Sequence, residues 1–203
     1  MPGQRNDMRS SGSSHARQLF ARARDLVRYW NITAAERTAQ YPCDCYVQSP
    51  SERFTRAVEV ESAPETVFRW LCQLKVAPYS YDWINNAGRR SPRSLAPDAD
   101  RLELGQEFLV FRLVEFEQDH HITGVVLPRA ERVFGQLAIS YIVEPRGAGR
   151  CRIVACLCAA VPSSVLESAR LTLLAFGDLL MMCKQLVTLK ERAERSVVES
   201  KGR

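Results

Sequence analysis

The sequence predicts an α+β fold in which a curved antiparallel β-sheet packs against one long C-terminal helix. Three observations support this. Residues 54–160 contain several short segments of alternating or continuous apolar residues, as strands do. Glycine- and proline-containing turns separate these segments, which favours antiparallel neighbours. An apolar segment with helical periodicity then runs from the cap at Ser164 to about Arg195, roughly 30 residues or about 45 Å at 1.5 Å per residue.

The domain is predicted to begin with a strand and two short helices. Alternating apolar residues predict a strand over 54–60. The segment Ser62-Ala63-Pro64-Glu65 resembles a capping box with proline in the first turn, which predicts a helix start with Ser62 as the N-cap. A second short helix is expected around residues 80–87, ended by Gly88.

Further strands are predicted after Gly105. They cover residues 108–116, 122–127, 134–143 and 150–160. The turn at 145–149 contains Gly147 and Gly149, which can adopt the positive φ that such a hairpin needs.

The last helix is predicted to start at a second capping box, formed by Ser164 and Glu167. The residues expected on its buried face are Leu166, Ala169, Leu173, Phe176, Leu180, Cys183 and Val187. Gly177 lies in the middle of this helix, where glycine costs about 1 kcal/mol of helix propensity. Its presence indicates either close approach of another backbone or space beside the helix.

The chain divides by composition into four parts. Residues 1–14 are predicted to be a disordered tail. Residues 15–53 comprise an amphipathic, arginine-rich helix at 16–30 and a linker that leads to the main domain. The main domain covers 54–197, and 198–203 form a tail. The N-terminal helix either packs on the body of the protein or docks on a membrane or a partner.

The overall composition excludes several classes of protein. With 203 residues and 46% hydrophobic content, the chain can bury one core. The net charge of +5 is scattered, so no nucleic-acid partner is expected. No export signal is seen, the apolar run Leu171 to Cys183 is too short to cross a bilayer, and a cytoplasmic location is predicted. The seven cysteines contain no CxxC pair, and neither a metal nor a cofactor is expected.

A short segment is unusually rich in aromatic residues. Tyr79-Ser80-Tyr81-Asp82-Trp83-Ile84-Asn85-Asn86 combines three rings with an acid and two amides. Rings with polar ends suit the wall or mouth of a pocket, although the same rings can simply close one end of a core.

Four segments of the chain form a recognisable set: Ala63 to Leu71, Tyr79 to Asn85, Leu104 to Glu107 and Leu189 to Glu194. Together they resemble the SRPBCC superfamily, and in particular its bacterial polyketide-cyclase-like branch. The resemblance implies a START-like helix-grip fold with a hydrophobic cavity between the sheet and the C-terminal helix. It implies no single chemistry, because this fold hosts lipid carriers, cyclases and proteins of unknown role. The chain departs from the pattern of this family at two places. The segment that leads to the aromatic stretch is shortened to Lys75 to Pro78, and Gln106 stands after Gly105 where the family commonly has an aspartate.

Few polar residues within the domain suggest chemistry. Arg112 interrupts an apolar strand and would bind a ligand's head group if it pointed inward, or lie on the sheet surface if it pointed outward. Asp178, in the apolar part of the last helix, is a candidate partner for it. His120 and His121 lie in a continuous polar stretch, which favours a turn between strands, although His121 with Asp119 could transfer protons.

These observations favour a protein that binds a hydrophobic small molecule, either a lipid or an aromatic polyketide-like compound. The pocket candidates are Trp70, Tyr79, Tyr81, Asp82, Trp83, Phe111, Arg112, Phe176 and Leu180. The alternative is an enzyme of the polyketide cyclase or dehydratase type, in which the cavity folds a flexible substrate into a reactive conformer. A third possibility is docking on a membrane or partner through residues 16–30. The sequence does not predict an oligomeric state.

Overall fold

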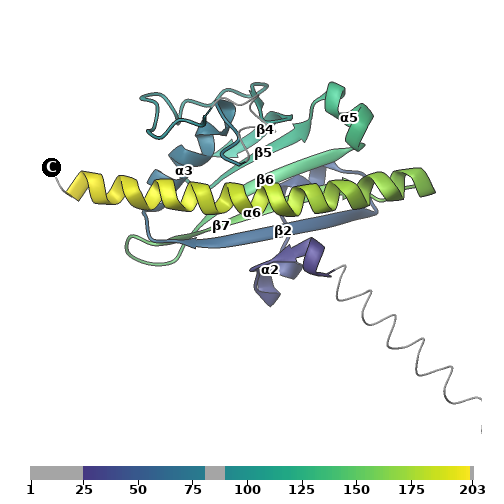
Figure 1. Cartoon of the computed structure of the whole chain (residues 1–203), viewed down its shortest axis with the longest axis horizontal. Helices are drawn as coiled ribbons and strands as arrows, with labels where there is room; N and C mark the ends of the chain where they lie inside the picture. The colour runs from purple at the N-terminus through teal and green to yellow at the C-terminus, as the bar shows by residue number, and fades with distance from the viewer. Residues whose placement is uncertain (1–24, 81–89, 202–203) are drawn as a thin grey trace, which may run out of the picture.

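The computed structural model describes residues 25–80 and 90–201, which form an α+β helix-grip fold (Figure 1). A seven-stranded sheet has the order β1-β2-β7-β6-β5-β4-β3. Its strands are β1 (Tyr29–Trp30), β2 (Ser51–Val60), β3 (Glu107–Phe108), β4 (Phe111–Glu117), β5 (His121–Val126), β6 (Leu137–Pro145) and β7 (Cys151–Ala160). Strand β1 pairs in parallel with β2, and the other neighbouring strands of the described chain are antiparallel.

One face of the sheet, here called the helix face, carries the C-terminal helix α6 (Val165–Lys201), as Figure 1 shows. Helix α3 (Pro64–Cys72) and the 3-10 turn η2 (Gln73–Lys75) follow β2 and complete the cover on this side. Buried residues from all these elements form the larger apolar core, among them Phe68 and Leu186. Removing such side chains from water is the main stabilising contribution to the fold.

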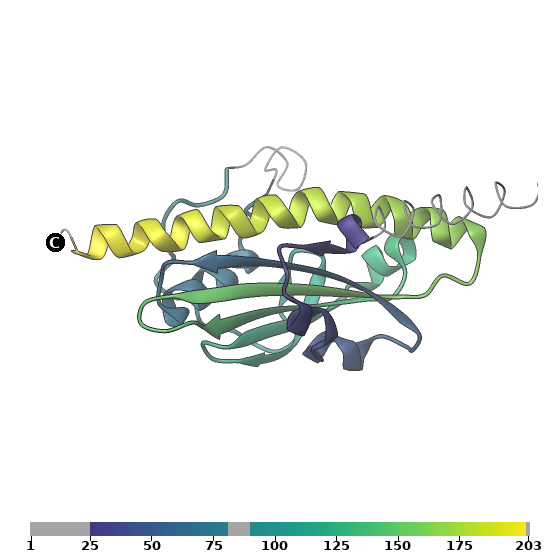
Figure 2. The same cartoon turned by 90° about the horizontal axis from the view of Figure 1, so that it is seen from below.

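The opposite face of the sheet, here called the outer face, is covered by the N-terminal segment (Figure 2). Helix α2 (Ala34–Thr38) and the 3-10 turn η1 (Pro42–Tyr46) lie there. The buried cluster on this face consists of Tyr41, Cys43, Val47, Ala57, Ala138, Ile142, Val154, Cys156 and Cys158. The sheet is therefore enclosed by apolar side chains on both faces over part of its area.

The N-terminal region differs from the helix and linker that the sequence predicts. Residues 25–28 are helical, but the chain then enters strand β1 instead of continuing as a helix to Trp30. The predicted linker contains α2 and η1, and β2 begins at Ser51, ahead of Phe54. Residues 1–24 lie outside the described residues, so the tail at 1–14 and most of the amphipathic helix stay predictions.

A buried ion pair joins this segment to the sheet, in addition to the apolar cluster. The carboxylate of Glu36 on α2 accepts hydrogen bonds from the guanidinium of Arg152 on β7 and closes a capping box with Thr33. The hydroxyl of Tyr41 donates to the carbonyl oxygen of Glu36 at 2.8 Å. These partners are distant in sequence, and composition alone could not reveal them.

The predicted strand at 108–116 is in fact a hairpin. Leu109 adopts a positive φ of 53°, and the chain turns at Leu109 and Val110 between β3 and β4. Gly124 on β5 makes room for this turn, because a Cβ there would lie 2.5 Å from Cε1 of Phe108. The tight turn depends on a contact across the sheet that strand periodicity does not encode.

The predicted strand at 134–143 begins only at Leu137. It is preceded by helix α5 (Pro128–Phe134), which was not predicted. Two sequence signals mark this helix: Pro128 in its first turn, and Gly135 directly after it with a φ of +79°. Strands β5 and β7 match their predicted ranges closely, and Gly147 and Gly149 have the expected positive φ.

The predicted helix caps are only partly correct. Helix α3 has Ala63 as its N-cap with no side-chain hydrogen bond, and the buried hydroxyl of Ser62 has no partner among the described residues. At the start of α6, the Ser164 hydroxyl accepts from the Glu167 amide at 3.2 Å, as predicted. The Glu167 carboxylate, however, accepts from the amide of Ser163. The helix continues through Lys201, so the predicted tail is helical in its described part.

Helix α6 turns a different face to the sheet from the one predicted. Its most buried residues are Ala175, Met182, Leu186, Leu189 and Ala193, whereas Leu173, Phe176 and Leu180 are 76%, 53% and 62% exposed. Residues 165–197 are long and apolar enough to cross a membrane by length and composition, a test that a core helix also passes. Because helix α6 itself carries apolar residues on all sides, the periodicity of its sequence could not identify its buried side.

Candidate functional site

A cavity of about 740 Å³ lies between the helix face of the sheet and helix α6. The sheet contributes a floor of buried apolar residues, which are Phe111, Leu137, Ile139, Tyr141 and Leu157. Helix α6 contributes Leu174, Gly177, Met181 and Met182, among others. This volume is within the range of sites that enclose small molecules.

The rim of the cavity is apolar and exposed. It includes Val76 and Val110 together with Val133 and Phe134 of α5, which are 40–56% exposed. Leu173 of α6 adds a further exposed side chain. Exposed apolar residues around an apolar chamber are typical of the entrance to a ligand site.

Two polar side chains in the cavity wall are fully occupied by each other and by the backbone. The hydroxyl of Tyr141 donates to Oε1 of Gln185 at 2.6 Å, and Nε2 of Gln185 donates to the carbonyl oxygen of Pro78 at 2.6 Å. Burial raises the pKa of Tyr141 well above its ordinary value, so the phenol is neutral. These two hydrogen bonds, which meet at Gln185, hold α6 against β6 and against the segment that follows η2.

A charged group also reaches the cavity wall. The carboxylate of Asp178 on α6 forms an ion pair of 2.8 Å with the guanidinium of Arg56 on β2. Burial raises the pKa of Asp178 to about 6, and the positive charge of Arg56 opposes this rise. Sequence reasoning named Asp178 but missed Arg56, although Arg56 shares the strand phase of Phe54 and Val58 on the helix face.

Gly177 resolves the alternatives that the sequence left open for it. A Cβ built on Gly177 meets no atom within 4 Å, and the residue lines the cavity. The glycine therefore leaves space beside the helix and does not serve a close contact with another backbone.

The predicted pocket residues are distributed over several environments. Phe111 lines the cavity. Trp70 and Tyr79 are buried in the core, where their rings meet edge to face at 5.7 Å and Trp70 donates to Ser196 at 3.2 Å; neither is among the residues that line the cavity. Phe176 and Leu180 point to solvent. Tyr81, Asp82 and Trp83 lie outside the described residues.

Arg112 does not reach the cavity. It is exposed on β4, whereas its neighbours Phe111 and Leu113 are buried toward the helix face. Successive side chains of a strand point to opposite faces, so Arg112 lies on the outer side of the sheet. The partner of Asp178 is Arg56 and not Arg112.

The two histidines are also remote from the cavity. His120 is in the turn between β4 and β5, as the polar stretch indicates, and lies 3.2 Å from a carboxylate oxygen of Glu117. His121 begins β5 and lies 3.2 Å from Glu115 of the neighbouring strand. His121 pairs opposite Ile142, a member of the outer-face cluster, so this group does not contact a ligand in the cavity.

The strand order, the long helix and the cavity between them define a helix-grip protein, as the resemblance to the SRPBCC superfamily predicts. Comparisons with protein-family models and with curated protein sequences found no match.

Solved structures with a similar chain path include a synthase and an aromatase/cyclase. Norcoclaurine synthase from Thalictrum flavum, in complex with dopamine and hydroxybenzaldehyde, has a TM-score of 0.45 at 10% identity over 73% of this chain and 87% of that chain. The Zhui aromatase/cyclase from Streptomyces sp. R1128 has a TM-score of 0.47 at 13% identity over 72% and 96%.

A solution structure from Thermobifida fusca has a TM-score of 0.48 at 20% identity over 70% of this chain and 93% of that chain. At these TM-scores, the assignment of the fold rests on the strand order and on the position of α6, not on the matches.

Proposed function

We propose that this protein binds a hydrophobic small molecule in the cavity between the sheet and helix α6. The observation that carries the proposal is the apolar chamber of about 740 Å³, with a buried floor and an exposed apolar rim. An apolar body placed there would leave water and contact aliphatic and aromatic side chains over most of its surface, which favours binding. A lipid or a fused-ring aromatic compound fits this description.

The charges at the cavity wall favour a ligand with an acidic or carbonyl end. Arg132 of α5 and Arg170 of α6 both line the cavity and are exposed. Lys75 also lines it, but its ammonium already donates to the backbone oxygens of Asp98 and Arg101. A guanidinium can donate two parallel hydrogen bonds to a carboxylate, so the two arginines are the better anchors.

Native mass spectrometry and a fluorescent probe test this function. The purified full chain is compared under gentle and denaturing conditions, and binding of 1-anilinonaphthalene-8-sulfonate is titrated. The variant Gly177→Phe places a ring in the cavity, because nothing occupies the space beside Gly177. The matched control Thr172→Phe places the same ring on an exposed position of the same helix.

We expect the wild type and Thr172→Phe to bind one probe molecule and Gly177→Phe to lose it. Equal binding by Gly177→Phe, or no binding by the folded wild type, would reject the cavity as the site. Palmitate and hexadecanol are then compared as competitors of the probe, since only palmitate carries a carboxylate. Competition by palmitate alone, which is lost in the double variant Arg132→Gln/Arg170→Gln, would show that the two arginines bind the acidic end of the ligand.

Catalysis of the cyclase or dehydratase type is the second candidate, because a buried carboxylic acid lies in the cavity wall. Asp178 has a pKa raised to about 6, which suits a general acid or base near neutral pH. One of its oxygens, however, is already held by Arg56 at 2.8 Å. This engagement, and the neutral Tyr141, favour binding over catalysis.

Recovery of the bound compound separates the two functions. A ligand that is released with an unchanged mass after prolonged incubation supports binding alone. Conversion of the ligand by the wild type, abolished in Asp178→Asn with probe binding retained, would establish the enzyme instead.

A further inference from the structure

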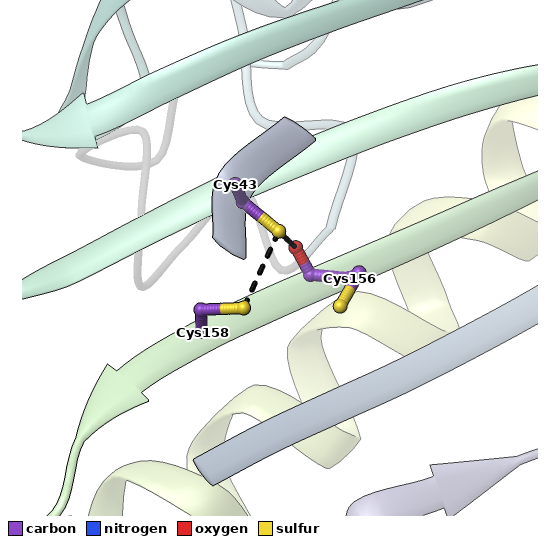
Figure 3. A group of neighbouring side chains, drawn as sticks. All are labelled: Cys43, Cys156 and Cys158. Carbon is purple, nitrogen blue, oxygen red and sulfur yellow. Dashed lines mark hydrogen bonds between the residues drawn. The ribbon is translucent and has the colours of Figure 1, made fainter. Parts of the chain in front are cut away.

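Three buried cysteines meet on the outer face of the sheet, away from the cavity. Cys43 comes from η1, and Cys156 and Cys158 lie on the same side of β7 (Figure 3). Their sulfur atoms all lie within 4.8 Å of one another, and Sγ of Cys43 is 3.4 Å from Sγ of Cys158. All three residues are 0% exposed. Because 113 residues separate Cys43 from Cys156, no sequence spacing reveals this group.

A carboxylate lies beside the group, next to one of its three sulfur atoms. Oδ1 of Asp44 lies 3.0 Å from Sγ of Cys158. The orientation of this carboxylate is fixed, because Arg53 contacts the same oxygen at 2.8 Å and the amide of Tyr41 donates to the other oxygen at 2.8 Å. Such outer partners orient ligands in metal sites. Cysteines that serve only as small apolar side chains do not require a charged group beside them.

We propose that Cys43, Cys156, Cys158 and Asp44 bind a zinc ion. A tetrahedral zinc site with Zn–S bonds of about 2.3 Å places its sulfur atoms roughly 3.8 Å apart. The three sulfur atoms all lie within 4.8 Å of one another and therefore require only small side-chain adjustments. Asp44 is not part of this close group, so its carboxylate must turn from Cys158 toward the centre of the three sulfur atoms. Three thiolates and one carboxylate supply the four ligands of a tetrahedral zinc site, and both thiolate sulfur and carboxylate oxygen bind zinc.

The charges and protons of this site balance. Binding replaces the three thiol protons, which leave to solvent, so four negative ligands surround a divalent ion. The adjacent guanidinium of Arg53 offsets part of the remaining negative charge.

The ion would fasten the N-terminal segment to the sheet. Residues of η1 contact β7 through Cys43 and Asp44, and the amide of Cys43 donates to the hydroxyl of Ser140 on β6 at 2.9 Å. Zinc would add metal–ligand bonds to these contacts between η1 and β7. This role is separate from the cavity on the helix face, and the proposed ligand binding does not depend on it.

Metal content and cobalt substitution test the site. The full chain is purified without chelator and its zinc is measured by elemental analysis. Chelator-treated protein is then titrated with Co²⁺, whose thiolate-to-metal charge-transfer absorption reports sulfur ligands, and with competing Zn²⁺. The variants are Cys158→Ser, Cys43→Ser and Asp44→Asn. The matched control is Cys151→Ser, since Cys151 is equally buried on β7 but belongs to the other core.

We expect one equivalent of zinc and a cobalt–thiolate band in the wild type and in Cys151→Ser. Both cysteine-ligand variants should lose the band. Asp44→Asn should weaken the affinity by at least roughly 10-fold, since changes to outer partners alone cost about 10–100-fold. No band in the folded wild type would overturn the proposal, as would an undiminished band in a folded Cys43→Ser. A mass loss of two hydrogens, reporting a Cys43–Cys158 disulfide as the native state, would also overturn it.

Discussion

Arg56 and Asp178 form an ion pair of 2.8 Å that joins strand β2 to helix α6, with side chains 0% and 8% exposed. The same guanidinium donates to the backbone oxygens of Val27 at 2.8 Å and Arg28 at 2.7 Å. One arginine therefore connects the N-terminal segment, the sheet and the C-terminal helix beside the cavity. Removing two charges from water is costly, and their attraction repays this cost only when the geometry is good.

The pH dependence of stability will show whether burial or Arg56 dominates at Asp178. Since burial raises the pKa of Asp178 from 3.8 to about 6, the folded state holds this proton more tightly than the unfolded chain does. The contribution of Asp178 to stability is then fully present below about pH 4 and is lost as the pH rises through about 6.

We expect the free energy of unfolding of the wild type, relative to Asp178→Asn, to fall by about 2–3 kcal/mol between roughly pH 4 and pH 7.5. Urea denaturation of both proteins over this range measures the difference. A difference that does not change with pH would mean that Arg56 compensates fully for the burial of the carboxylate.

Gly177→Ala should stabilise the protein. The added methyl group meets no atom within 4 Å, and alanine is favoured over glycine inside a helix by about 1 kcal/mol. We expect the free energy of unfolding to rise by about 0.5–1 kcal/mol, measured by denaturant titration. A loss of stability would indicate that the space beside the helix is smaller than the structure shows.

Gly124→Ala, the same chemical change on β5, should have the opposite effect. Its methyl group would lie 2.5 Å from Cε1 of Phe108 and 2.9 Å from Cβ of Phe111, so the β3–β4 turn must shift. Such overpacking costs about 1–3 kcal/mol. Thermal unfolding of this variant beside Gly177→Ala provides the comparison, and equal stability of the two would contradict the close contact.

Two leucines of α6 should respond very differently to truncation. Leu186 is fully buried in the larger core, whereas Leu180 is 62% exposed. We expect Leu186→Ala to lower the free energy of unfolding by about 2–5 kcal/mol. Leu180→Ala should change it by less than about 0.5 kcal/mol beyond the difference in helix propensity. Denaturation midpoints with equal m-values would measure both. A large loss at Leu180 would support the helix orientation that the sequence predicts.

Local signals in the sequence were sufficient for much of the fold. Alternating apolar residues predicted β2, and Gly147 with Gly149 predicted the hairpin between β6 and β7. Helix α5 was missed because its seven residues are too few for a clear period, and only Pro128 and Gly135 marked it. The fold of residues 34–46 could not be foreseen, since its stability depends on Glu36 meeting Arg152 across the sheet.

The candidate site was less predictable than the fold, because a cavity is lined by residues from distant elements. The existence of a chamber under α6 follows from the curved sheet and the helix. Its lining depends on the rotation of α6 about its axis, and apolar residues on all sides of that helix hide this rotation. Of the predicted residues in the described chain, Phe111 lines the cavity because the strand phase of β4 was sufficient to orient it.

Strand β7 is buried on both faces of the sheet, and this affects how its register is fixed. Leu157 faces the cavity, while Cys156 and Cys158 point to the outer face, where they belong to the group of three cysteines. A sheet with one wet face rejects a one-residue slip because apolar side chains would enter water. Here both sides are dry along residues 153–159, so hydropathy opposes such a slip mainly at Arg152, whose charge would leave Glu36 and enter the apolar core. The length of the 145–150 hairpin and this ion pair therefore fix which side chains of β7 line the cavity, and a one-residue slip would turn sulfur atoms toward it.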